Sequence, residues 1–203
     1  MGNVLLNEYS SSNVKMIRES GDQSSPIWLL VNSKYPNDVF DIWTPILYEI
    51  QDRVYRKLHA RIDREKIYIM YASSNIGRVV NTSKFLPAKT AAEILKLRKS
   101  ILQHQPKLLI TFGTITNELG QRIFTEQTED GPDYWKSANL ETEFERSIVN
   151  FDITRTNWIP LIRKVKGWKS LQDWEESERY FREAATKIAD KIIENKESLK
   201  VWI

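Results

Sequence analysis

One stretch, residues 91–119, constrains the fold of this chain most, because it joins a helical pattern directly to a strand pattern. Its first part carries apolar residues at the three-and-four spacing that places them on one stripe of an amphipathic helix. These residues are Ile94, Leu97, Ile101 and Leu102. The helix is expected to end before Pro106, because proline lacks an amide hydrogen and its ring blocks the helical backbone.

An apolar run, Leu108–Phe112, follows this helix at once. It is too short for a helix and therefore predicts a buried strand, after which Gly113 allows a sharp turn. A helix, a strand and a tight glycine turn in this order make up half of an α/β crossover. Because ligands bind beyond the carboxyl ends of the strands in such sheets, we expect residues 111–116 to lie near any binding site.

Two more apolar runs of strand length, Ile27–Val31 and Ile67–Tyr71, predict strands that are buried on both faces. The segment between them has a helical pattern that starts at Val39 and carries Phe40 on its apolar side. Pro45 either kinks this helix or marks its true first turn.

The later part of the chain continues the alternation of helix and strand. We expect a helix over residues 116–124, a helical turn over 141–148, a short strand over 151–153 and a long helix over 174–195. This order predicts an α/β fold, a single three-layer domain with a mainly parallel sheet. The domain is expected to span residues 26–203, after a polar N-terminal arm over residues 1–25.

Composition limits the function classes. The chain has 203 residues, a net charge of +3, no cysteine and only two histidines, His59 and His104. The absence of cysteine excludes disulfides and thiolate metal sites, and we expect no metal and no cofactor. The mild charge is compatible with nucleic acid without arguing for it. No signal peptide or membrane-spanning run appears, so the expectation is a cytoplasmic protein with no membrane contact.

Three polar loops follow the three predicted strands and should meet at one edge of the sheet. They are residues 32–38, which include Asn32, Lys34 and Tyr35, residues 73–75, which include Asn75, and the pair Gly113 and Thr114. An amide such as Asn75 can read a donor and an acceptor together, and backbone amides at a helix start can hold an anion. Ordinary turns and helix caps would explain the same residues.

A basic segment near the end of the chain interleaves cations with tryptophans, as surfaces that grip phosphates and stack on bases do. Its cations include Arg155, Arg163, Lys164 and Lys166, and its tryptophans are Trp158 and Trp168. Together with Asn157, this segment is a candidate nucleic-acid contact, although a solvated loop has a similar composition.

The layout of these elements resembles the uracil-DNA glycosylase superfamily. The resemblance rests on the strand with its NSKYP loop, the strand with its Asn-bearing loop, the segment AAEILKLRKSILQHQPKLLITFG, and a late proline loop before a terminal helix. It covers roughly residues 26–195 and concerns layout more than any complete motif. The resemblance implies a uracil-DNA glycosylase-like fold. It also implies a mechanism in which a nucleotide is extruded from the nucleic acid into a pocket of the protein.

The resemblance also implies roles for individual residues. Asn32 would position a water, Lys34 would act electrostatically, Tyr35 would stack on the base and Asn75 would read its edge. The last family motif would fall on residues 157–161, with Trp158 or Ile159 as the wedge that fills the gap. The water-activating Asp and the His of the family are missing at the matching positions.

Three functions remain open on the sequence alone. The preferred one is a non-cleaving module that binds nucleic acid or a nucleotide, because the expected Asp and His are absent. The first alternative is an active DNA glycosylase that hydrolyses the N-glycosidic bond of a flipped base in DNA repair. The second is a protein-interaction subunit of a regulatory or defence system, which would use exposed tryptophans such as Trp168, Trp174 and Trp202 and the acidic loop 126–135.

Overall fold

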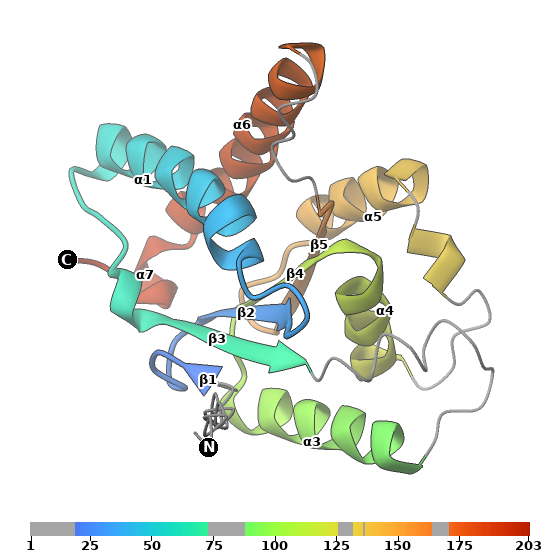
Figure 1. Cartoon of the computed structure of the whole chain (residues 1–203). Coiled ribbons are helices and arrows are strands. Elements are labelled where there is room, and N and C mark those ends of the chain that lie inside the picture. The colour runs from blue at the N-terminus through green and yellow to red at the C-terminus, as the bar shows by residue number, and fades with distance from the viewer. Residues whose placement is uncertain (1–18, 73–87, 126–131, 136, 164–170) are drawn as a thin grey trace, which may run out of the picture.

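The computed structural model describes residues 19–72, 88–125, 132–135, 137–163 and 171–203. These residues form one α/β domain with a five-stranded sheet in the order β1-β3-β2-β4-β5 (Figure 1). The strands are β1 (Glu19–Ser20), β2 (Ile27–Asn32), β3 (Ile67–Ala72), β4 (Leu108–Phe112) and β5 (Asn157–Leu161). Strands β2 to β5 are mutually parallel, and β1 alone pairs antiparallel, with β3.

The central expectation about the sheet is confirmed. The three apolar runs lie side by side and point in the same direction, with Leu29 of β2 in register with Ile69 of β3 and Ile110 of β4. Strand β2 is buried along its whole length, which explains why its sequence is a continuous apolar run without polar alternation.

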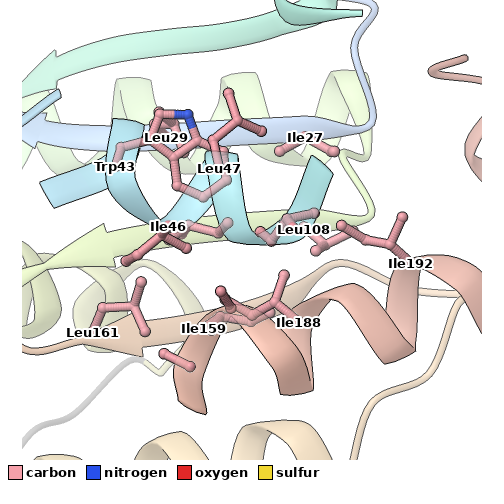
Figure 2. Packing of buried hydrophobic residues seen from close by; sticks show 14 of the residues in the cluster. Ile27, Leu29, Trp43, Ile46, Leu47, Leu108, Ile159, Leu161, Ile188 and Ile192 are labelled. Atoms are coloured by element: carbon pink, nitrogen blue, oxygen red, sulfur yellow. The ribbon is translucent and has the colours of Figure 1, made fainter. Parts of the chain in front are cut away.

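Helices cover both faces of the sheet, so that the domain has three layers (Figure 1). Consecutive side chains of β2 point to opposite faces, and Leu29 belongs to one buried cluster while Leu30 belongs to the other. The first cluster is closed by α1 (Thr44–Leu58), α5 (Ser137–Val149) and α6 (Leu171–Glu194), and the second by α3 (Ala88–His104) and α4 (Gly113–Phe124). Figure 2 shows Leu47 of α1 beside Leu29 of β2, and Ile188 of α6 beside Ile159 of β5.

Short helices join these elements. They are η1 (Val39–Trp43), η2 (Arg64–Lys66), η3 (Pro132–Trp135) and α7 (Lys196–Leu199). Pro45 lies in the first turn of α1, so the second of the two roles expected for it is the correct one. The π-type turn of η1 adds a residue to the helical repeat just before α1. This shift rotates Phe40 off the apolar stripe, and Phe40 is 70% exposed where the sequence predicted it to face inward.

Helix α3 also departs from its expected pattern in one place. Ile94 and Ile101 are buried and Leu97 packs against the same cluster, as predicted, but Leu102 is 65% exposed. Leu102 lies about 100° around the helix from Ile101, which is beyond the edge of a narrow apolar stripe. It lies instead on the outer face together with Leu95.

The last strand is not where the sequence predicted it. Residues 151–153 form no strand, and β5 occupies residues 157–161, which had been expected to be a loop. The amide of Asn157 donates to the carbonyl of Lys107, which precedes β4. Because backbone N–H groups alternate in direction along a strand, the backbone nitrogen at position 160 faces away from β4. Pro160 therefore lacks its amide hydrogen on the open side of an edge strand, which is where a sheet tolerates proline.

The sheet begins before Pro26, where the domain had been expected to start. Glu19 and Ser20 pair with Met70 and Ile69 as strand β1, and the rest of the predicted arm, residues 1–18, lies outside the described residues. No helix among the described residues has both the length and the apolar character needed to span a membrane.

Candidate functional site

The strand order creates a switch point at the carboxyl ends of β2 and β4. From β2 the chain moves outward to β3 on one side, and it then crosses to β4 on the other side of β2 (Figure 1). The loops that follow β2 and β4 therefore part from each other, and in open α/β sheets ligands bind in the crevice between such loops. We call this region the carboxyl edge.

The loop after β2 is fixed by hydrogen bonds to Asn32. The side-chain Oδ1 of Asn32 accepts from the Lys34 amide at 2.9 Å, and its carbonyl accepts from the Tyr35 amide at 2.8 Å. The amide of Ser33 bonds the carbonyl of Ala72 at 3.0 Å, which ties the turn to the end of β3. Lys34 is left exposed, and the buried Oγ of Ser33 has no hydrogen-bond partner within the described part of the chain.

Gly113 lets β4 pass directly into α4. Its φ of +79° suits glycine, and a Cβ at this position would lie 2.6 Å from the Cβ of Arg163. The hydroxyl of Thr116 accepts from the Phe112 amide at 2.9 Å and so satisfies a backbone group at this junction. The start of α4 therefore lies directly against Arg163, two residues after the end of β5.

The position of Arg163 is set from three sides. The amide of Ile162 donates to the hydroxyl of Tyr180 at 2.8 Å, and burial raises the pKa of Tyr180, which keeps this hydroxyl neutral. The Nε of Arg163 donates to both carboxylate oxygens of Asp38, at 2.8 and 3.0 Å. The guanidinium also lies 4.0 Å from the ring centroid of Tyr35.

These contacts produce a cationic, aromatic group at the carboxyl edge. The ammonium of Lys34 lies 5.4 Å from the ring centroid of Tyr35, so that two cations lie close to one aromatic ring. Asp38 balances one of the two positive charges. Arg163 contacts Asp38 through Nε. Its two Nη groups make no hydrogen bond to any residue that the structure describes.

A buried polar network supports this edge from below. The hydroxyl of Thr111 donates to Oδ1 of Asn117 at 2.5 Å, and it accepts from the indole of Trp158 at 2.9 Å. The amide group of Asn117 donates to the carbonyl of Leu161 at 3.2 Å. Glu118 is fully buried and bonds Arg122 at 2.6 Å. These hydrogen bonds connect α4 to β4 and β5 near the carboxyl ends of the two strands.

The structure brings together only some of the candidate residues. Those at the carboxyl edge are Asn32, Lys34, Tyr35, Gly113, Thr114 and Arg163. Arg155 and Asn157 lie at the opposite, amino end of β5, and Trp158 lies within that strand, with its indole against α4. Asn75, Lys164 and Lys166 lie outside the described residues, as does Trp168.

Sequence reasoning missed the importance of Asp38. In the sequence, Asp38 is the last residue of the 32–38 loop, where Asp is an ordinary turn residue. In the structure its side chain is 2% exposed and paired with Arg163, 125 positions away in the chain. No local pattern indicates such a pair.

Neither histidine of the chain lies at the carboxyl edge. His59 ends α1 in a left-handed conformation, and His104 lies in the last turn of α3, beside Trp28. Both of these helices end at the amino side of the sheet, because each is followed by a parallel strand. Within the described ranges, no three His, Asp or Glu side chains are grouped so as to hold a metal ion.

Comparison with known proteins assigns no family to this chain. Neither the protein-family models nor the curated protein sequences match it. The candidate site therefore rests on geometry and chemistry alone.

Proposed function

We propose that the carboxyl edge binds nucleic acid or a nucleotide without cleaving it. The single observation that carries this proposal is the group formed by Lys34, Tyr35 and Arg163 at the switch point of the sheet. Cations beside an aromatic ring are how proteins hold a phosphate backbone and stack a base. The Nη groups of Arg163 offer a planar fork of donors that matches a phosphate.

The arrangement of Tyr35 refines its expected role. The guanidinium of Arg163 lies 4.0 Å from the Tyr35 ring centroid, so a base that stacks on this ring uses its other face or displaces Arg163. A base displacing Arg163 would leave the buried carboxylate of Asp38 without its partner, which is costly. We therefore propose that the base uses the face of Tyr35 away from Arg163.

Three observations support binding without cleavage. The carboxylate of Asp38 is buried and accepts from Arg163 through both oxygens, so that it does not serve as a free base for water. The Oδ1 atom of Asn32, which would position water, is occupied by the Lys34 amide. Glycosidic cleavage also needs a group that stabilises the leaving base, and both histidines lie at the other side of the sheet.

The finer fold assignment, a uracil-DNA glycosylase-like domain, is part of this proposal. Its support is the succession of elements on which the resemblance rests: β2 with its NSKYP loop, α1, β3, α3, and β4 with its glycine turn into α4. The late proline is a departure, because Pro160 lies inside β5 and not in a loop. The loop of that motif would then begin at Ile162.

Fluorescence anisotropy with a labelled single-stranded oligonucleotide tests the proposal. We expect binding that weakens steeply as salt rises, and we expect Lys34→Glu to reduce the salt slope by about 1 and the affinity by about tenfold. Lys57→Glu is the matched control, because Lys57 is also exposed but lies on α1 near its carboxyl end. Equal losses in the two variants, or no binding by the unaltered protein, would rule out this site.

The same preparation separates the two alternatives. Release of free uracil from a uracil-containing strand would replace the non-cleaving module with an active glycosylase. Salt-insensitive self-association without oligonucleotide binding would indicate a protein-interaction subunit. Our expectation is oligonucleotide binding with no base released.

A further inference from the structure

A pocket lies away from the carboxyl edge, along the open edge of β5. It has a volume of about 280 Å³ and is enclosed by the end of α4, the later part of α5, the loop that joins α5 to β5, and β5 itself. Three residues that the sequence marked as nucleic-acid contacts, and that the carboxyl edge does not use, line it. They are Arg155, Asn157 and Trp158.

The loop that forms one wall of this pocket is held in shape by Asn157. Its side-chain amide donates to the carbonyls of Lys107, Asp152 and Arg155, at 3.0, 2.8 and 3.1 Å. Its Oδ1 accepts from the Asp152 amide at 2.8 Å. Asn157 thus orders the wall before any ligand binds, and its own polar atoms are used in doing so.

Two arginines stand at the mouth of the pocket. Arg155 donates through Nη2 to the carbonyl of Asn150 at 3.2 Å, which orients its guanidinium. Its carboxylate neighbour, Asp152, is 3.7 Å away and is engaged by the amide and hydroxyl of Thr154. Arg146 pairs with Glu143 at 2.7 Å. Arg155 is therefore the less neutralised cation, and the arginines together favour an anionic ligand.

Aromatic and backbone groups complete the lining. Phe124 lies over Trp158 with ring centroids 6.1 Å apart and an angle of 19° between the planes, and its ring remains partly exposed. Because Asn157 bonds toward β4, the backbone N–H and C=O of Trp158 point to the open edge. An adjacent donor and acceptor on the backbone can pair with the polar edge of a planar ring.

We infer that this pocket binds one nucleotide unit, with its base against Phe124 and the edge of β5 and its phosphate at Arg155. The volume lies just below the range of about 300–1,000 Å³ that holds drug-sized ligands, which fits a single base with its sugar and phosphate. A free nucleotide and one unit of a strand share this chemistry. The inference does not depend on the carboxyl edge, because the two sets of residues lie at opposite ends of β5.

Amide chemical shifts of the full chain provide the test, with uridine monophosphate and a short oligothymidylate as probes. We expect saturable shifts at Ser147 and Thr156, which line the pocket, with at least one probe. Tighter binding of the oligomer would identify a strand as the source, and equal affinity would identify a free nucleotide. No saturable shift at these residues with either probe would overturn the inference.

Variants locate the binding. Arg155→Glu and Phe124→Ala should each weaken it about tenfold or more, whereas Arg56→Glu, at an exposed arginine of α1, should leave it unchanged. Lys34→Glu should also leave it unchanged, so that failure of the carboxyl edge and failure of this pocket give different results. Circular dichroism confirms that each variant is folded. An unchanged affinity in folded Arg155→Glu would contradict the inference.

Discussion

At the scale of single residues, the geometry depends on a few polar side chains that make several contacts each. Asn157 bonds the loop before β5, and Asp38 bonds Arg163, which lies two residues after β5. Gly113 and Gly120 act by having no Cβ, since one at Gly120 would lie 2.5 Å from the indole of Trp158. Substitutions at such positions change both stability and binding, because one side chain serves several partners.

Replacing Asn157 with alanine should lower the free energy of unfolding by about 2–4 kcal/mol, because it removes the four hydrogen bonds that this side chain makes to partly buried backbone groups. Urea denaturation measures this loss. Asn139→Ala is the control, since Asn139 is exposed and, among the residues that the structure describes, bonds the carbonyl of Tyr134 alone, so its loss should be below about 1 kcal/mol. Equal losses would mean that Asn157 does not organise the loop.

The change Asp38→Asn should shift stability and binding in opposite directions. It removes the charge that balances Arg163, so oligonucleotide affinity should rise a few-fold while the free energy of unfolding falls by about 1–3 kcal/mol. Anisotropy and urea denaturation measure the two effects. A fall in affinity in the folded variant would contradict this prediction, because the amide oxygen of asparagine can still accept from Nε of Arg163 and hold it in place.

At the scale of elements, apolar patterns predicted the strands that lie inside the sheet and missed the one at its edge. Strands β2, β3 and β4 are continuous apolar runs because they are covered on both faces. Strand β5 begins with Asn157 and contains Pro160, features that usually indicate a loop. Its strand character comes from pairing with β4 and from the tolerance of an edge for proline, neither of which is local information.

Helix α3 gives a direct test of which face is buried. Ile101→Ala should lower the free energy of unfolding by about 2–4 kcal/mol, because Ile101 is buried against β2 and β4 residues. The neighbouring change Leu102→Ala should cost less than about 0.5 kcal/mol, because Leu102 is largely exposed. Urea denaturation of the two variants measures the difference, and a larger loss for Leu102→Ala would reverse the assigned orientation of the helix.

At the scale of the whole molecule, the sequence predicted a parallel α/β sheet with polar loops at one edge, but not which residues meet there. The loops after β2 and β4 start at the same edge of the sheet, as expected, because neighbouring parallel strands end on one side. The Asp38–Arg163 pair and the separation of Arg155 and Asn157 from Arg163 depend on where β5 starts and ends. Because β5 occupies residues 157–161, Arg155 lies at the amino end of the strand and Arg163 lies at its carboxyl edge.

The stability of the whole fold should fall in alkali. Burial is the main cause that raises the pKa of Tyr68 from 10.0 to about 12. The unfolded chain therefore loses this proton first, so this contribution to the free energy of unfolding is constant below pH 10 and falls by about 2 kcal/mol as the pH approaches 12. Urea denaturation across this range should show a shallower decline for Tyr68→Phe. Tyr48→Phe, at an exposed position, is the control, and an equal effect there would refute the assignment.

The most direct test of the central claim is a map of amide chemical shifts as a single-stranded oligonucleotide is added to the full chain at low salt. Binding at the carboxyl edge predicts saturable shifts at Lys34, Tyr35, Gly113 and Thr114, and about tenfold more oligonucleotide should be needed to saturate them in Lys34→Glu. The absence of any saturable shift at these four residues would contradict it.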